Sequence, residues 1–433
     1  MGKTENVSIV SDALLCNSCG ACYAVCSKFA ISYVETAGGY VFPEIDSTKC
    51  NKCGLCFRVC PGIHLGSTLK SSMPADPFVG TIQTAYVGKA NDAEIDRNSQ
   101  SGGATTALLN YLLEAKHIEA AVVSVMKTSS PPRGEVILAR TRTDLISAQK
   151  SKYTPIPILK IAKALKEIEG KVAIVGLPCH IHGLLNLIDL DPTLGKKIAI
   201  KIGLICERVF TTAAIDFLSR KVTREMCSRV IFKDKNKPVY PGNVIVHTVS
   251  GKEYQVDSTV RLSIKDFFTP ARCTICFDKL NVFSDITMGD PHGVTGIDRI
   301  RGESLVMCRT PLGAQLVDNA VHRKILSLRP ADKDQVLSGQ KIAEKKRAWQ
   351  IYKSLWNEQS SFKPDHFSVI EPKAPSNQHL EKGLLGNSFK LAEFSSREKV
   401  IRYYSTKLFL QSIRTKLNPK RLIRFAVRIF RNP

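Results

Sequence analysis

Three features are missing from this sequence of 433 residues, and each absence excludes a class of protein. The opening segment, MGKTENVSIVSDALL, lacks the basic, apolar and small-residue order of a secretory signal. No apolar run is long enough to span a bilayer. No Ser-His-Asp set or pair of carboxylates stands out, so hydrolytic chemistry has no support. We therefore expect a cytoplasmic protein, in which thiols stay reduced and closely spaced cysteines indicate metal or redox chemistry.

Acids are scarce relative to bases, with 39 Asp and Glu against 62 Lys and Arg and a formal net charge of +23. The excess is concentrated at the C-terminus, where eleven Lys or Arg from Arg397 onward stand against one acid, Glu398. Such a charge suggests an anionic partner, for example an acidic protein, a polyanionic cofactor or a membrane surface. We expect no nucleic-acid partner, because no recognised binding fold accompanies the charge.

Cysteines, by contrast, are abundant, and eight of the fourteen fall in two runs with the spacing C-x2-C-x2-C-x3-C. In bacterial ferredoxins such a run supplies three ligands to one 4Fe-4S cluster and a fourth ligand to the other cluster. Zinc sites normally use two separated C-x2-C pairs, which these runs fit poorly. We therefore predict a ferredoxin-like domain over residues 1–68, with GGYVFPEID as a short hairpin or strand. The predicted ligands are Cys16, Cys19, Cys22 and Cys60 for one cluster, and Cys50, Cys53, Cys56 and Cys26 for the other.

Beyond the polar linker GSTLKSSMPADP, apolar runs alternate with helical stretches. This alternation predicts an α/β domain over residues 80–342, with a mainly parallel sheet covered by helices, so the chain as a whole is α/β or α+β. In such sheets ligands bind at the carboxyl ends of the strands. The predicted strands are 84–90, 120–126, 135–141, 171–177, 197–206 and 285–290, and the predicted helices are 102–118, 157–170 and 179–188.

Four further cysteines fall at positions that this rule makes informative. Cys179 follows a predicted strand, Cys206 ends another, and Cys273 with Cys276 forms a C-x2-C pair before a third. If the strand ends converge, the four thiolates suffice for a third cluster. The residues alone leave open the alternative that Cys179 and Cys206 are ordinary buried cysteines. The remaining two, Cys227 and Cys308, have no partners in the sequence and are interpreted as structural.

The stretch QSGGATTALLNYLLE, residues 100–114, places a Ser-Gly-Gly turn before an apolar helix. Free N–H groups at a helix start suit a phosphate or an electron-rich ring edge, although a Gly pair often simply begins a helix. The strings SKY at 151–153 and GDPHG at 289–293 are ambiguous in isolation, and so are His180 and His182.

Taken in order, the ferredoxin repeat, QSGGATTALL, SKY, GLPCHIHGL, GLICE, CTICFD and DITMGD resemble the coenzyme F-420 hydrogenase/dehydrogenase beta-subunit family. The resemblance runs from Cys16 to ESLVMCRT. It implies an oxidoreductase in which FAD exchanges a hydride with an organic acceptor and single electrons with iron-sulfur clusters. It also implies a third 4Fe-4S cluster held by Cys179, Cys206, Cys273 and Cys276. The cofactor-binding residues that it implies are Gln100, Ser101, Gly102, Gly103, Ala104, Lys152, Tyr153, Gly289 and Asp290.

Two departures from the archaeal pattern bear on the substrate. His180 follows Cys179 where glutamine is commoner, and Glu207 follows Cys206 where the family often has histidine. The acceptor is accordingly expected to be coenzyme F-420 or a related compound. The redox partner is expected to be a ferredoxin or a hydrogenase-like subunit. The alternative function is a non-catalytic electron-transfer subunit of a larger redox complex.

Residues 343–433 are predicted to form a polar linker followed by a basic amphipathic tail. In PKRLIRFAVRIFRNP the arginines share one helical face and apolar residues share another. Such a helix is suited to peripheral contact with an anionic membrane face, or to docking on its own domain or on an acidic partner subunit.

Overall fold

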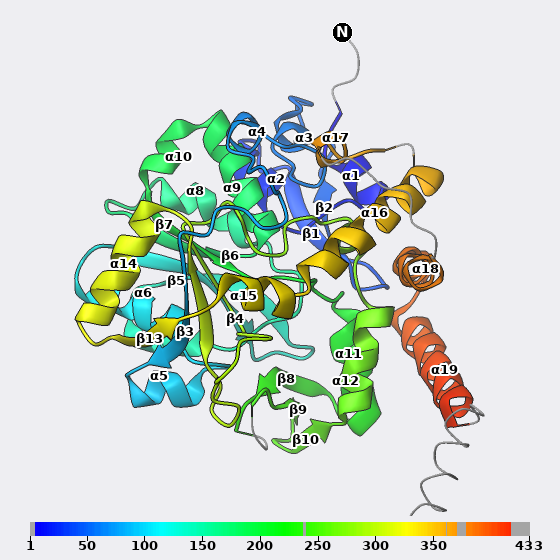
Figure 1. Cartoon of the computed structure of the whole chain (residues 1–433). Helices are drawn as coiled ribbons and strands as arrows, with labels where there is room; N and C mark the ends of the chain where they lie inside the picture. The colour runs from blue at the N-terminus through cyan, green and yellow to red at the C-terminus, as the bar shows by residue number, and fades with distance from the viewer. Residues whose placement is uncertain (1–4, 237–239, 361, 370–377, 417–433) are drawn as a thin grey trace, which may run out of the picture.

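The computed structural model describes residues 5–236, 240–360, 362–369 and 378–416 (Figure 1). The cysteine-rich N-terminal part, blue in Figure 1, consists of short helices around one antiparallel hairpin, in which Ile31 pairs with Ile45. The predicted strand in GGYVFPEID is confirmed as the second strand of this hairpin. The elements are α1 (Ser8–Asp12), α2 (Ala21–Val25), β1 (Ile31–Glu35), β2 (Val41–Ile45), α3 (Leu55–Arg58) and α4 (Ser67–Ser71).

The two cysteine runs follow the same backbone path. Ser18 and Lys52, at equivalent positions, both have φ near +55°, with values of 53° and 57°. Two residues later Gly20 and Gly54 have φ of 100° and 73° and begin α2 and α3. Residues other than glycine rarely adopt such angles, so the turn favours the glycine that follows the second cysteine of each run. The sequence repeat is thus also a structural repeat.

The centre of the molecule is a sheet of eight strands in the order β13-β3-β12-β11-β7-β6-β4-β5. β4, β6, β7 and β11 are parallel to one another, whereas the outer pairings are antiparallel. The predicted fold class is confirmed, with a mixed sheet whose parallel strands lie in the middle. The strands are β3 (Thr84–Ala90), β4 (Ala120–Lys127), β5 (Arg133–Ala139), β6 (Val172–Gly176), β7 (Ile198–Leu204), β11 (Ile286–Gly289), β12 (Ser304–Cys308) and β13 (Leu326–Pro330).

Helices cover both faces of this sheet because its central strands are apolar on both sides. In β4, Ala121 and Val123 face one core cluster while Ala120 and Val122 face another. The first cluster includes α6, which lies within the predicted helix at 102–118, and the second includes α9. The predicted helix at 157–170 is shorter, a 3-10 turn that leads into α8. The covering helices are α5 (Ala93–Asn98), α6 (Ala104–Glu114), α7 (Arg142–Ser147), η1 (Ile158–Ile161), α8 (Ala162–Leu165), α9 (Pro178–Leu190), α10 (Pro192–Lys196) and α14 (Pro311–His322).

A second, smaller sheet lies at the bottom of Figure 1, in the order β10-β9-β8, beside α11 and α12. It is antiparallel throughout. This part of the chain separates β7 from β11 in sequence, and it brings β8 to the edge of the site described below. Its elements are α11 (Ala213–Val222), β8 (Cys227–Asp234), β9 (Asn243–Thr248), β10 (Glu253–Val256), α12 (Ser258–Phe267) and α13 (Ala271–Thr274).

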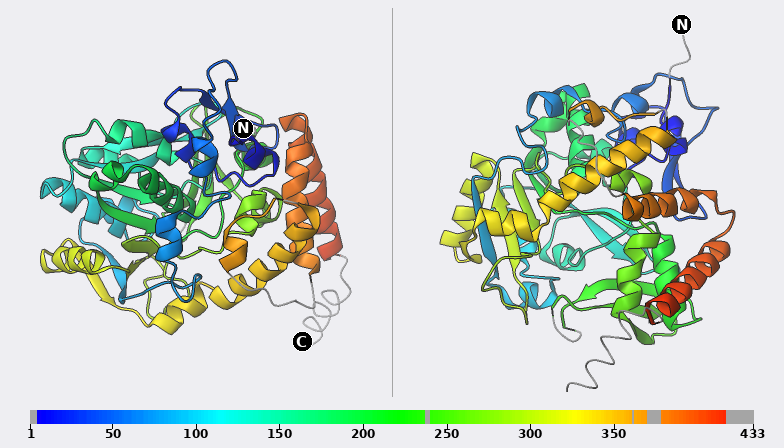
Figure 2. Two further views of the ribbon diagram at one scale, coloured as in Figure 1. Left: turned by 90° about the horizontal axis from the view of Figure 1, so that it is seen from above. Right: turned by 45° about the vertical axis from the view of Figure 1, so that its right-hand side comes forward.

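The segment after residue 342 differs from the predicted polar linker. α16 runs diagonally across the molecule in Figure 1 and buries Trp349 and Trp356 completely. α18 and α19 lie along one edge (Figure 2), where Tyr404 is buried against Phe267 and Phe268. These aromatic side chains supply the apolar area that holds the segment against the core. The elements are α15 (Lys333–Gly339), α16 (Ile342–Gln359), α17 (His366–Val369), α18 (His379–Glu393) and α19 (Arg397–Lys416).

None of the helices in the described ranges is long and apolar enough to cross a membrane. The predicted amphipathic tail segment at 419–433 lies outside the described residues, so its contact with a membrane or a partner stays a prediction.

We predict that Trp349→Ala lowers the free energy of unfolding by about 3 to 5 kcal/mol, because it leaves a cavity in a fully buried site. It also removes the indole N–H that donates to the Ile275 carbonyl at 2.8 Å. The measurement is denaturant unfolding followed by far-UV circular dichroism. Leu380→Ala is the control, since Leu380 is 67% exposed and its truncation should change stability by less than about 0.5 kcal/mol. Equal effects of the two substitutions would contradict a core role for α16.

Candidate functional site

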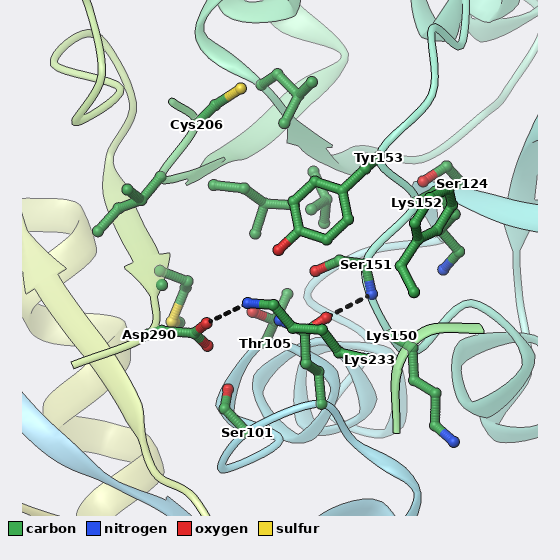
Figure 3. Close-up of a pocket in the computed structure, with 18 of the residues that line it drawn as sticks. Ser101, Thr105, Ser124, Lys150, Ser151, Lys152, Tyr153, Cys206, Lys233 and Asp290 are labelled. Atoms are coloured by element: carbon green, nitrogen blue, oxygen red, sulfur yellow. Dashed lines mark hydrogen bonds and ion pairs between the residues drawn. The ribbon is translucent and has the colours of Figure 1, made fainter. Parts of the chain in front are cut away.

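A cavity of about 500 Å³ opens at the carboxyl ends of the four parallel strands (Figure 3). β6, β7 and β11 contribute their last residues to its wall, and β4 contributes a residue from its second half. Ser124 comes from β4, Gly176 from β6, Leu204 from β7 and Gly289 from β11. This is the edge at which ligands bind in open α/β sheets, as expected from the strand pattern. The volume is within the range of small-molecule and cofactor sites.

The Ser-Gly-Gly turn forms the start of α6 at the floor of this cavity. Gly103 has φ of 75° and occupies the position before the first helical residue, so glycine is favoured there. Gly102 is pressed against two strands, and a Cβ at this position would lie 2.4 Å from the Gly88 carbonyl oxygen and 2.6 Å from the Ser304 nitrogen. The tight contact brings the N-terminus of α6 to the cavity, where Ala104 and Thr105 line the wall.

A buried lysine that the sequence pattern did not single out holds this turn in place. Lys235 Nζ donates to Asp96 Oδ1 at 2.9 Å, to Ser99 Oγ at 3.2 Å and to the Ser101 carbonyl at 2.6 Å. Lys235 follows β8 directly, so the small sheet fixes the turn from outside the eight-stranded sheet. On the other side, Gln100 Oε1 accepts from the Ser151 backbone N–H at 3.1 Å, which joins the turn to the SKY string.

The polar centre of the cavity is an ion pair between Lys233 and Asp290, whose atoms are 3.1 Å apart (Figure 3). Burial alone would lower the pKa of Lys233, but the Asp290 carboxylate and Tyr153 raise it above its usual value, so the lysine stays charged. The Tyr153 ring points into the cavity, 5.6 Å from Lys233 Nζ, and packs on Phe210 and Phe232. Lys233 was not predicted as a site residue, because a lysine in a strand of alternating polar and apolar residues, such as β8, is expected to face solvent.

Lys152 is arranged differently from the expected flavin contact. Its Nζ donates to the carbonyl oxygens of Ala148 and Gln149, the latter at 2.9 Å, at the end of α7. Burial lowers the pKa of Lys152 to about 7.

Eight of the nine predicted cofactor-binding residues line this one cavity, and Gly102 stands behind its wall. The eight are Gln100, Ser101, Gly103, Ala104, Lys152, Tyr153, Gly289 and Asp290.

The four later cysteines, Cys179, Cys206, Cys273 and Cys276, converge on a second, smaller cavity of about 40 Å³. Burial raises the pKa of each thiol. For Cys179 and Cys206, the neighbouring thiols of the group raise the pKa further. Among the described residues, no three His, Cys, Asp or Glu side chains are placed to hold a single metal ion. The four thiols therefore line a small cavity and do not converge on the position of one metal ion.

The two cavities share a wall, which contains Thr154, Leu177, His180 and Cys206. Burial lowers the pKa of His180 to about 4, and its Nδ1 accepts from the Leu177 backbone N–H at 3.1 Å, which leaves the ring proton on Nε2. Thr154 Oγ1 is buried and has no hydrogen-bond partner among the described residues. Thr154 and His180 thus place polar groups between the cavities.

Glu207, also in this wall, is surrounded by cations. Burial would raise its pKa, but Lys345, Lys279 and Arg208 lower it to about 2. Lys279 Nζ lies 2.8 Å from one carboxylate oxygen, and Lys345 Nζ lies 3.5 Å from the other.

In the first N-terminal set, the thiols of Cys16, Cys19, Cys22 and Cys60 affect one another electrostatically. Burial raises the pKa of Cys16 to about 11 and that of Cys60 to about 12, and the Cys16 thiol contributes to the shift of Cys60. Burial also raises the pKa of Cys19 and Cys22, and Cys60 adds to both shifts.

In the second set, Cys50 and Cys53 contribute to the raised pKa of Cys56, after burial. Cys26 ends α2, and its sulfur accepts from the Ala30 N–H at 3.4 Å. Its assignment to the second cluster stays a prediction. Cys227 in β8 and Cys308 in β12 are buried within strands and belong to none of these sets.

The three thiol sets lie next to one another in space. The Cys179 thiol raises the pKa of Cys19, and the Cys56 thiol raises that of Cys22, each after burial. A Cβ added at Gly183 of α9 would lie 3.3 Å from the Cys19 sulfur, so the helix that begins beside Cys179 packs directly on the first set. The order in space is the large cavity, the later four thiols, the first N-terminal set and the second set.

Comparison with known proteins identifies the family of this chain. Residues 85–163 match the N-terminal part and residues 169–334 the C-terminal part of the coenzyme F420 hydrogenase/dehydrogenase beta subunit. The chain belongs to this family. Residues 15–62 match a 4Fe-4S dicluster domain, so this member of the family is an iron-sulfur oxidoreductase.

Three similar proteins illustrate the family. The coenzyme F420 hydrogenase subunit beta of Methanosarcina barkeri is 23% identical over 66% of this chain and 99% of its own length. The coenzyme F420 hydrogenase subunit beta of Methanothermobacter thermautotrophicus is 28% identical over 59% of this chain and 86% of its own. The coenzyme F420-dependent sulfite reductase of Methanocaldococcus jannaschii is 28% identical over 73% of this chain and 47% of its own.

The fold of the family is seen in a solved structure of the F420-reducing [NiFe] hydrogenase complex from Methanosarcina barkeri. One of its chains matches with a TM-score of 0.51 and 22% identity, over 66% of this chain and 96% of that chain.

We predict that Gly102→Ala destabilises the protein by about 1 to 3 kcal/mol, because the added methyl group meets backbone atoms of β3 and β12 that cannot move aside. Thermal unfolding monitored by circular dichroism measures the effect. Gly383→Ala in α18 is the matched control, since nothing lies within 4 Å of its added Cβ and alanine favours a helix. A loss of stability in Gly383→Ala alone would contradict this account of the turn.

Proposed function

We propose that this chain is an FAD-dependent oxidoreductase subunit that passes electrons between an organic hydride acceptor and three 4Fe-4S clusters. The acceptor proposed is coenzyme F-420 or a related compound. The observation that carries the proposal is the shared wall between the large cavity and the four-thiol cavity, with two further thiol sets beyond it. A flavin in the large cavity would thus stand next to the first of three metal sites.

The thiol sets have the chemistry that clusters require. Each ligand must be deprotonated, yet burial raises the pKa of the thiols in the first and third sets, so a positively charged group has to stabilise them as thiolates. Iron supplies that charge in 4Fe-4S sites. Cys179, Cys206, Cys273 and Cys276 would hold the third cluster, and the two N-terminal sets would hold the clusters of the dicluster domain.

The large cavity has the features that a flavin nucleotide requires. The N-terminus of α6, where Thr105 and Thr106 line the cavity, offers backbone N–H groups and a positive dipole end to a pyrophosphate. The Tyr153 ring offers an apolar face, and Thr154 Oγ1 offers a hydrogen bond that no described residue uses. When bound, FAD exchanges a hydride with the organic acceptor and single electrons with the clusters.

The protein's own residues orient the cofactor and keep its surroundings charged in a fixed pattern. Lys235 and Gln100 hold the turn, and the Lys233–Asp290 pair occupies the polar centre of the cavity. Lys233 presents an ammonium group to whichever anionic part of the cofactor or acceptor lies there. The similarity to proteins named for coenzyme F420 supports the choice of acceptor.

The first test is the iron, sulfide and FAD content of anaerobically purified protein, followed by its visible spectrum during addition of reduced coenzyme F-420. We expect about twelve irons and one FAD per chain, with bleaching on addition. The same cofactors without bleaching would retain the cofactor assignment and exclude that acceptor. Protein that contains iron but no flavin would overturn the proposal in favour of an electron-relay subunit.

We further predict that Cys206→Ser lowers the iron content by about four per chain and leaves the N-terminal clusters in place, because only the third site loses a ligand. Iron analysis and electron paramagnetic resonance of the reduced protein give the readout. Cys227→Ser is the control, since Cys227 is a buried cysteine outside all three sets. Unchanged iron in Cys206→Ser would exclude the third cluster.

A further inference from the structure

Arg272 lies between two of the thiol sets, directly before Cys273 in sequence and bound to the backbone that follows Cys60. Its side chain is only 4% exposed. Nε donates to the Gly62 carbonyl at 3.3 Å, and Nη2 donates to the Pro61 carbonyl at 3.3 Å. The guanidinium group therefore joins the α13 turn, which supplies ligands to the third set, to the end of the ferredoxin run.

This cation has no anionic partner among the described side chains. Both hydrogen bonds go to neutral carbonyls, and Nη1 is buried with no hydrogen-bond partner in the described ranges. The other cations near these thiols are arranged differently, because Arg208 and Lys345 both pair with Glu207. A buried charge without a counter-charge costs several kcal/mol, so this position calls for an anion that the side chains do not supply.

Both flanking thiol sets are adjacent to the charge. Arg272 directly precedes Cys273 in sequence, and the carbonyls of Pro61 and Gly62 that it contacts follow Cys60. Cys60 belongs to the first N-terminal set and Cys273 belongs to the third. One guanidinium group thus lies beside two neighbouring sites.

We propose that Arg272 is the shared counter-charge of the third cluster and of the Cys16, Cys19, Cys22 and Cys60 cluster, and that it raises the reduction potentials of both. The inference rests on the proposed function. Each cluster becomes one unit more negative when it takes up one electron, with no bond formed and no proton required. A fixed positive charge between the two stabilises both reduced forms, wherever the electron resides. Burial limits screening by solvent, so the effect acts at the distance between the sites.

The test is a redox titration of the anaerobically purified full-length chain, followed by electron paramagnetic resonance, in wild type, Arg272→Gln and Arg272→Lys. In Arg272→Gln we expect both flanking potentials to become more negative by at least about 59 mV, a tenfold change in each one-electron equilibrium. The cluster of Cys50, Cys53, Cys56 and Cys26 should move less. Arg272→Lys keeps the charge and should stay close to wild type. The electron paramagnetic resonance signal that is absent from Cys206→Ser identifies the third cluster.

Arg309→Gln is the matched control, because Arg309 is also 4% exposed and donates to carbonyls of residues 79, 81 and 280 and to Thr287, none of which is next in sequence to a thiol of the three sets. The cluster potentials of Arg309→Gln should equal those of wild type. This control separates loss of a charge beside the clusters from loss of a buried arginine elsewhere.

Three results would overturn the inference. Unchanged potentials in Arg272→Gln with about twelve irons would overturn it and leave the proposed function standing. If Arg272→Gln does not retain its clusters, Arg272→Lys decides, because potentials shifted in the lysine variant would show that the hydrogen bonds matter and the charge does not. Wild-type protein with only about eight irons would overturn the third cluster and this inference together.

Discussion

Clustered, buried thiols are the feature on which the rest of this structure depends. Burial raises the pKa of the thiols in the first and third sets, and neighbouring thiols raise the pKa of Cys19, Cys60 and Cys206 further, so these thiols are neutral without a compensating positive charge. Arg272 places one positive charge beside the third set, directly before Cys273 in sequence. The left-handed turns at Ser18, Gly20, Lys52 and Gly54 shape the two N-terminal loops that carry the other cysteines.

The same balance of burial and charge organises the large cavity. Lys233 is paired with Asp290, Lys235 with Asp96, and Lys279 with Glu207. The carboxylate beside each lysine stabilises its charge in a partly dry environment. These ion pairs fix the positions of the charged groups around the cavity and its turn before any ligand arrives.

The topology explains why these groups meet. The carboxyl ends of four parallel strands open on one edge, and the residues after β6 and β7 carry Cys179 and Cys206 to the same point. α16 then packs across the core, with Trp349 donating to the Ile275 carbonyl between Cys273 and Cys276 in sequence. The C-terminal helices thus support the turn that holds the C-x2-C pair, and the N-terminal domain closes the far side through Cys19 and α9.

Local sequence determined those parts of the protein whose causes are local. The repeated cysteine spacing predicted the dicluster domain, alternation of strands and helices predicted the fold class, and QSGGATTALL predicted a turn opening a helix. β12 and β13 were not predicted, because a short apolar strand has no distinctive period. The burial of Trp349 and Trp356 was also missed, since α16 is polar on average and its apolar side chains become informative only against a partner surface. Tertiary structure alone decided that Cys179, Cys206, Cys273 and Cys276 converge and that Arg272 lies between two thiol sets. It also decided that Lys233 reaches the cavity, and Lys235 the turn beside it, from a second sheet. Each of these facts depends on contacts between segments far apart in sequence, and no local propensity encodes the distance between them.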